Sequence, residues 1–213
     1  MHGTKHFATI SPFKPAKEFP VKRMQLVLIL ATALAVALGG CSRQNTTDQP
    51  KAAKPAQPYE AVAAQGKGFT VGAMMSANTV YVMFDPQCPH CGHLWQASLP
   101  LHKKVKFVWI PISIMGGKSV PQGAALLAAA NPTELMSEHE ASVLANTGGI
   151  SASASISAEM EQAIKNNTEL FNSLGVESVP YILARNLRTS QIVTNNGALS
   201  TPALAEFLGV DQP

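Results

Sequence analysis

Apolar residues along the chain follow patterns that switch between strand-like and helix-like periods. Residues 79–84 (TVYVMF) form a continuous β-branched and aromatic run, which is typical of a strand buried on both faces. A helix is predicted at 89–103, followed by a second strand at 105–114 that is interrupted or ends near Pro111. Because strand, helix and strand follow in this order, we expect a parallel pair joined by a helical crossover.

Further helical stretches precede the last strands. The first covers residues 119–130, and the second runs from Asn131 to about 145, with Pro132 at its first helical position. The third begins near Ser157 and ends at Gly175. Two short strands at 181–184 and 191–194 and a closing helix at 201–208 complete the chain. The pattern predicts an α/β domain with a helical insertion.

The composition suits one ordinary domain and excludes a wholly disordered chain. The 213 residues are 46% hydrophobic and 14% charged, so a hydrophobic core can form. The net charge of +3 arises at the start, where residues 1–40 hold five basic residues and one acid. The remainder, with eleven basic and twelve acidic residues, is nearly neutral. Since nucleic-acid binding requires a basic patch, we expect no nucleic-acid partner.

The first forty residues have the features of an export signal. Residues 24–38 are apolar and follow two basic residues, but they are fewer than the roughly 20 needed to span a membrane. The segment LGGC, which ends at Cys41, resembles the bacterial lipobox, and this implies that Cys41 is lipidated after residues 1–40 are removed. We expect a lipid anchor on the periplasmic side of a bacterial membrane, with Ser42 favouring the outer membrane. An ordinary signal with Cys41 as a bystander, or a start at Met24, stays open.

A polar, proline-containing linker at residues 41–58 then leads to one folded domain at 59–213. If Cys41 carries lipid, Cys88 and Cys91 are the only thiols left. An oxidising compartment lets this pair form a disulfide, which the cytosol would keep reduced.

The motif Cys88-Pro89-His90-Cys91 places two thiols one helical turn apart, directly after the strand at 79–84. Free backbone N–H groups and the helix dipole stabilise a thiolate at a helix start, so Cys88 is predicted to be the nucleophile. Pro89 suits the first helical position because its missing N–H is not needed there. Cys91 lies within reach as the resolving thiol, and a protonated His90 would lower the thiol pKa further. This chemistry needs no cofactor.

Other interpretations of the two cysteines were weighed. They could form half of a zinc site, with His93 or His102 as further ligands, but no second cysteine pair is present. A purely structural disulfide would close too short a loop to add much stability. Haem attachment is excluded because Gly92, and not histidine, follows the second cysteine.

The segment YVMFDPQCPHCGHLW resembles the active-site segment of the DsbG/DsbC group of thioredoxin-fold thiol:disulfide interchange proteins. The resemblance extends from about residue 80 to 208. It implies a thioredoxin fold, with the helical insertion at about 119–174 lying between the second strand and a cis-proline loop. Pro180 occupies the cis-proline position, and Val179 before it would pair with an extended substrate beside Cys88.

Several residues depart from that group. Val179 and the Cys-Pro-His-Cys tetrapeptide look more like the DsbA oxidases. Val82 stands where thioredoxin has a buried aspartate, and Asp85 is not assigned that role. Because only a linker and about twenty residues precede the first predicted strand, where the group has a dimerisation domain, we expect a monomer.

The sequence thus predicts a thiol:disulfide oxidoreductase that acts on exported proteins with cysteines and on a membrane redox partner. Oxidation, reduction and isomerisation stay open as its net direction, and a metal-binding module stays the alternative outside enzymes. Each direction needs an exposed Cys88 and a shielded Cys91. Simpler roles are expected for the other conspicuous side chains: packing for Leu94, Trp95, Leu99 and Trp109, solvation for His102 and His139, and an apolar lip for substrates at Met74 and Met75.

Overall fold

The computed structural model describes residues 57–153 and 155–213, which fall within one compact unit. In chain order its elements are α1 (Pro58–Gln65), β1 (Phe69–Gly72), β2 (Thr79–Phe84), α2 (Pro89–Ser98), the short 3₁₀ turn η1 (Leu99–Leu101), β3 (Lys106–Pro111), α3 (Ser119–Leu127), α4 (Pro132–Leu144), α5 (Ala158–Ser173), β4 (Tyr181–Arg185), β5 (Ile192–Asn196) and α6 (Thr201–Leu208). Residues 1–56, with the expected signal, Cys41 and most of the linker, lie outside this description.

The strands form one mixed sheet in the order β1-β3-β2-β4-β5. β2 and β3 are parallel, as the strand-helix-strand pattern predicts, and α2 is the crossover between them. The other neighbouring strands are antiparallel. Since β2 pairs on both sides, it is central, and Cys88 lies shortly beyond its carboxyl end. The α/β thioredoxin fold expected from the resemblance is confirmed.

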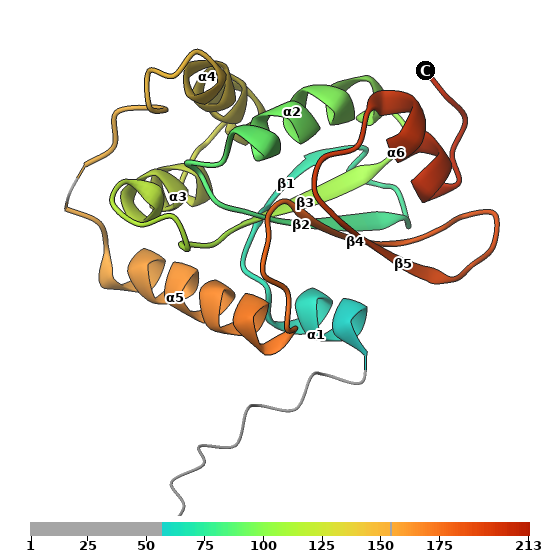
Figure 1. Cartoon of the computed structure of the whole chain (residues 1–213), viewed down its shortest axis with the longest axis horizontal. Coiled ribbons are helices and arrows are strands. Elements are labelled where there is room, and N and C mark those ends of the chain that lie inside the picture. Colours follow the sequence, from blue (N-terminus) through green and yellow to red (C-terminus); the bar gives the residue numbers. More distant parts are fainter. Residues whose placement is uncertain (1–56, 154) are drawn as a thin grey trace, which may run out of the picture. The chain divides into compact units, whose positions relative to one another are not determined.

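Helices cover both faces of the sheet (Figure 1). α2, α4 and α6 pack on one face, around a core that contains Val82, Trp95 and Met136. α1 and α5 pack on the other face, where Met83 and Phe171 are buried. Consecutive residues of β2 point to opposite faces of the sheet, so its continuous apolar run contributes side chains to the cores on both faces.

Helices α3, α4 and α5 lie between β3 and the loop before β4. The side chains of Asn131 and Ser157 accept hydrogen bonds from the first turns of α4 and α5, which is the usual role of such residues at a helix start. Gly175 follows the end of α5 with a positive φ of 66°, a conformation that favours glycine. These local signals explain why the helix bounds match the sequence pattern closely.

Residues 59–78 carry no predicted helix or strand, whereas the structure forms α1, which begins at Pro58, and β1 there. In α1 only Val62 is buried, and β1 has just four residues, so neither gives a strong periodic pattern. The strand at 79–84 is therefore the second strand, and β3 ends at Pro111, as the proline there predicts.

Candidate active site

The loop after β2 sets Cys88 at the start of α2. Cys88 caps the helix with an extended backbone and Pro89 is the first helical residue. The Cys88 N–H donates to the Asp85 carbonyl at 2.9 Å, and the Cys91 N–H donates to the Cys88 carbonyl at 2.9 Å. Both cysteines thus lie on the first turn of one helix, as the sequence predicts.

Asp85 is a buried structural carboxylate that holds the loops around this turn. One oxygen accepts hydrogen bonds from the Gln87 N–H at 2.9 Å and the Ser119 hydroxyl at 2.6 Å. The other accepts from the N–H groups of Ile114 and Met115, at 2.7 and 2.9 Å. Because its oxygens face four donors, Asp85 stabilises the loop after β3 beside the cysteines.

The two thiols differ in exposure and acidity. Both are free, so the structure shows the reduced pair. A hydrogen bond from Cys91 is the largest cause that lowers the pKa of Cys88, from 9.0 to about 6, against the opposing effect of burial. Burial raises the pKa of Cys91 well above its ordinary value. At neutral pH Cys88 is therefore mostly thiolate and Cys91 keeps its proton.

Cys88 is less accessible than expected. Only 5% of the residue is exposed, against none of Cys91. Its Sγ lies 3.7 Å from the carbonyl oxygen of Val179, in the loop before β4, and this loop helps to cover it. The expectation of a shielded Cys91 is confirmed, whereas that of an openly exposed Cys88 is wrong.

Val179 and Pro180 meet the cysteine pair because β4 pairs with β2. The peptide bond between them is cis, as the resemblance implies. Val179 is half-buried and Pro180 is buried. The structure thus brings the two cysteines together with Val179 and Pro180, the residues at which the resemblance implies substrate contact.

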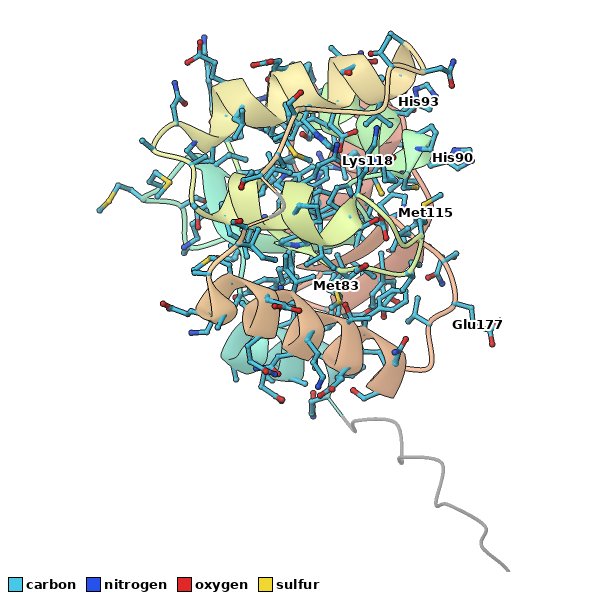
Figure 2. The ribbon with its side chains drawn as sticks, turned by 90° about the vertical axis from the view of Figure 1, so that its left-hand side faces the viewer. Met83, His90, His93, Met115, Lys118 and Glu177 are labelled. Carbon is cyan, nitrogen blue, oxygen red and sulfur yellow. The ribbon has the colours of Figure 1, made fainter. Side chains whose placement is uncertain are left out.

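His90 and Pro89 are exposed at the start of α2. Figure 2 shows His90 and His93 projecting outward from this end of the molecule, with their ring centres 6.3 Å apart. The charge of His90 is the smallest of the causes that lower the pKa of Cys88, behind the hydrogen bonds from Cys91 and the His90 backbone. The acidity of Cys88 therefore comes mainly from hydrogen bonding.

Two histidines expected to be solvated are instead packed into the fold. His139 is fully buried; its Nε2 lies 2.7 Å from the Pro86 carbonyl, and its Nδ1 accepts from the Ile150 N–H at 3.2 Å. A carbonyl only accepts, so Nε2 carries the proton. His102 is partly buried against the Trp95 ring and contacts the Ser98 hydroxyl. Both predictions of solvation are wrong, since tertiary contacts cover these helix positions.

The packing interpretation holds for Leu94, Trp95 and Trp109, which are almost wholly buried, while Leu99 is 39% exposed at the rim. Met74 and Met75 are exposed, but they lie in the turn before β2, at the opposite end of that strand from Cys88. Six strand residues span about 20 Å. A substrate lip at these methionines is therefore wrong.

Glu140 in α4 is a further candidate site residue that is not among those predicted from the sequence. This residue is 1% exposed, and neither carboxylate oxygen has a hydrogen-bond partner among the described residues. Burial, followed by the charges of Cys88 and Asp85, raises its pKa well above the ordinary value. A signal existed: Met136, Glu140 and Val143 follow the three-to-four spacing of a buried helix stripe. An acid in such a stripe is costly unless it has a partner or a function.

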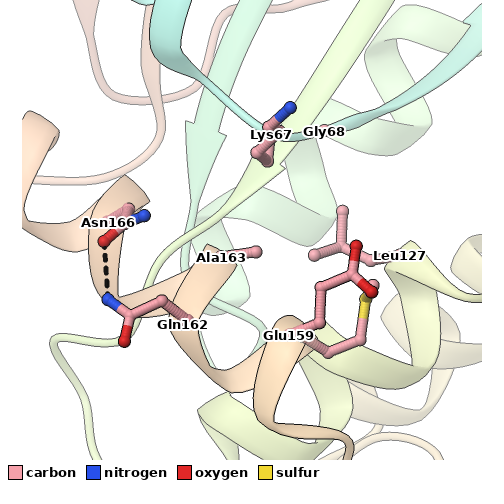
Figure 3. A pocket seen from close by; sticks show the side chains of 8 residues that line it. Lys67, Gly68, Leu127, Glu159, Gln162, Ala163 and Asn166 are labelled. Carbon is pink, nitrogen blue, oxygen red and sulfur yellow. Dashed lines mark hydrogen bonds between the residues drawn. The ribbon is translucent and has the colours of Figure 1, made fainter.

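A surface cavity of about 440 Å³ lies between α5 and the segment before β1 (Figure 3). Lys67, Glu159 and Asn166 line it (Figure 3), and neither cysteine is among the lining residues. Within residues 57–153 and 155–213, no group of three or more histidine, cysteine or acidic side chains is placed to hold a metal ion. Helices of this same part are all too short or too polar to cross a membrane.

An acidic thiol at the start of α2, a buried second thiol and a facing cis-proline define a thioredoxin-fold dithiol protein. Comparisons with known proteins agree. No family model matches the chain. The thiol:disulfide interchange protein DsbG of Pseudomonas aeruginosa is 31% identical over 140 residues, 65% of this chain and 54% of that protein. DsbG of Escherichia coli is 31% identical over 108 residues, 48% of this chain and 42% of that protein.

The chain thus spans about half the length of the curated relatives it matches. Among solved structures, the catalytic domain of Proteus mirabilis ScsC superimposes with a TM-score of 0.56 at 16% identity, over 71% of this chain and 97% of that one. At this identity the likeness establishes the fold. The chain is therefore similar in sequence to these DsbG proteins, and its fold is that of the thioredoxin-like structures.

Proposed function

We propose that the chain is a thiol:disulfide oxidoreductase that exchanges disulfides with cysteine-containing exported proteins. The observation that carries this proposal is the contrast between the two thiols of one helical turn: Cys88 ionises at a pKa of about 6, whereas Cys91 is buried and protonated. A thiolate is the attacking species in disulfide exchange, and its reactivity is greatest when its pKa lies near the ambient pH. The names of the DsbG relatives support the same activity.

In the reducing direction, the Cys88 thiolate attacks one sulfur of a substrate disulfide, and the other substrate sulfur leaves as a thiolate. Cys91 then loses its proton and attacks the Cys88 sulfur, which releases the substrate. The substrate disulfide gains two electrons and the cysteine pair loses two in forming its own disulfide. In the oxidising direction these steps reverse, and a substrate thiolate attacks the Cys88 sulfur.

Substrate binding is proposed at the loop before β4. The Val179 carbonyl already lies 3.7 Å from the Cys88 sulfur, so a peptide in extended conformation that pairs with this backbone has its own sulfur next to Cys88. Pro180 has no N–H, and Val179 therefore supplies the pairing groups.

The proposed location is the periplasmic side of a bacterial membrane, with a lipid on Cys41 and a membrane protein as redox partner. The apolar segment at residues 24–38 and the LGGC sequence support export and lipidation. Expression with a labelled fatty acid checks the anchor: wild-type protein should carry the label and Cys41→Ser should not. Label on both proteins would contradict lipidation at this sulfur.

Trapping the mixed disulfide tests the activity. Cys91→Ala removes the resolving thiol, so this variant should accumulate a disulfide-linked adduct with a peptide that contains one disulfide. Cys88→Ala is the matched control and should form no adduct. Absence of adducts from Cys91→Ala, with stoichiometric zinc or copper bound to the reduced wild type instead, would overturn the proposal in favour of a metal-binding module.

Equilibration with glutathione buffers measures the net direction. A potential near about −120 mV would favour an oxidase, and one near −200 mV or below would favour reduction or isomerisation.

A further inference from the structure

Glu140 lies against the turn that carries the cysteines. α4 packs on α2 (Figure 1), and a Cβ added to Gly92 would lie 2.9 Å from a Glu140 carboxylate oxygen and 3.0 Å from Leu144. Only a glycine directly after Cys91 leaves this space free. The carboxyl group therefore occupies the room that a larger residue at position 92 would fill.

The groups around Glu140 give it no neutralising partner. The ion pairs of the described residues, Arg185–Glu60 and Arg188–Asp211, do not involve it. The titratable groups that act on it are Cys88, from the start of α2, and Asp85, from the end of β2. Glu140 in turn raises the pKa of Cys91. The ring nitrogens of neighbouring His139 are engaged by Pro86 and Ile150, so this histidine does not serve as its partner.

We propose that Glu140 exchanges a proton with the Cys91 thiol during the resolving step. The inference rests on the proposed function. Val82 is apolar and buried in the core beneath α2, and the Asp85 carboxylate directly after β2 is engaged by four hydrogen-bond donors. In the reducing direction, the Cys91 proton passes to the Glu140 carboxylate, either directly or through a water. The Cys91 sulfur then bonds to the Cys88 sulfur, and the substrate sulfur leaves with the electron pair of the broken S–S bond. In the oxidising direction, Glu140 returns the proton to Cys91 as it leaves the disulfide.

The charge of Cys88 couples Glu140 to the state of the reaction. In the resting reduced pair, the Cys88 thiolate is one cause that raises the pKa of Glu140, after burial itself. When Cys88 is bonded to a substrate sulfur this charge is gone, so the pKa of Glu140 falls and the carboxylate form becomes more populated. A proton acceptor is thus generated at the stage when Cys91 must lose its proton.

A chromogenic aromatic disulfide tests this step, since it releases one coloured thiol when Cys88 attacks and a second when Cys91 resolves. Glu140→Gln should leave the first phase within about twofold of wild type. The second phase should be slower by at least roughly tenfold near neutral pH, because removing a proton acceptor typically costs more than this. Its rate should also lose the inflection with pH that ionisation of Glu140 causes.

Two further variants separate proton exchange from structural effects. Glu138 is exposed on the same helix, so Glu138→Gln should follow wild type in both phases. Glu140→Asp keeps a carboxyl group and should restore part of the inflection. Stability is a second readout: a folded pKa raised above the unfolded value means that Glu140 opposes folding increasingly as the pH rises through the folded pKa. Glu140→Gln should therefore be at least as stable as wild type at neutral pH.

The outcomes distinguish the inference from the function on which it rests. If wild type shows no first phase, the oxidoreductase proposal itself fails. If wild type shows both phases and the second phase of Glu140→Gln has the same rate and pH profile, the role of Glu140 is refuted. A slower second phase in Glu140→Gln with an unchanged pH profile would also refute it, since a packing defect alone would produce that result.

Discussion

Replacing Cys91 by alanine should raise the pKa of Cys88 more than replacing His90 by alanine. The hydrogen bond from Cys91 is the largest cause that lowers the pKa of Cys88 to about 6, and the charge of His90 is the smallest. A hydrogen bond to a charged acceptor contributes about 1.5–3 kcal/mol, which changes a pKa by about one to two. An exposed charge contributes less than about 1 kcal/mol, so His90→Ala should change it by well under one.

Thiolate absorbance as a function of pH gives these values directly. Wild-type Cys88 should titrate near pH 6, Cys91→Ala about one to two pH units higher, and His90→Ala close to wild type. Because the folded pKa is lowered, the reduced protein should gain stability as the pH rises above about 6 and lose it as the pH falls through about 6. That gain should shrink in Cys91→Ala. A larger rise in His90→Ala than in Cys91→Ala would refute the argument, since charge and not hydrogen bonding would then govern Cys88.

Four substitutions test the framework around the site, each by urea unfolding. Asp85→Asn turns an amide N–H₂ toward N–H or O–H donors, so it should lower the free energy of unfolding by about 2–4 kcal/mol. Ser119→Ala removes one of the four donors and should lower it by less. Asn167→Ala removes the buried amide that bonds the Lys67 backbone and the Pro111 carbonyl, and should cost about 2–3 kcal/mol. Gly149→Ala places a Cβ 2.6 Å from the His139 ring at a φ of +82° and should cost about 2 kcal/mol or more. Wild-type midpoints for these variants would contradict the contacts described.

Local chemistry made part of this fold predictable. The run at β2 is bounded correctly because five of its six residues are β-branched or aromatic and the sixth is Met83, a pattern that fits few alternatives. The start of α6 follows from Thr201 and Pro202, and that of α2 from Pro89 after a cysteine. The approach of Val179 and Pro180 to Cys88 followed from the resemblance, since no local pattern links positions 91 residues apart.

The rest depended on contacts between distant segments. β1 is too short to give a pattern of its own and is defined by its pairing with β3. Burial of His139 and Glu140 depends on α4 packing against α2 and on the chain near Ile150, which no periodicity specifies. His90 lowers the pKa of Cys88 as predicted, but the larger effect of the hydrogen bond between the thiols depends on the geometry of the turn, which the sequence does not give.

The placement of Glu140 gives the helical insertion a function beyond covering the sheet. With Val82 in the core, the face of β2 beneath the cysteines is apolar, so an acid for the resolving thiol has to come from the helical layer. An acid on α4 keeps its position only while α4 stays packed on α2, and Gly149 and Gln122 support that packing through His139 and Ile150. A substitution that weakens these contacts of Gly149, Gln122, His139 and Ile150 should therefore slow the resolving step by Cys91. The attack by Cys88 should stay nearly unchanged, because the acidity of Cys88 arises within α2.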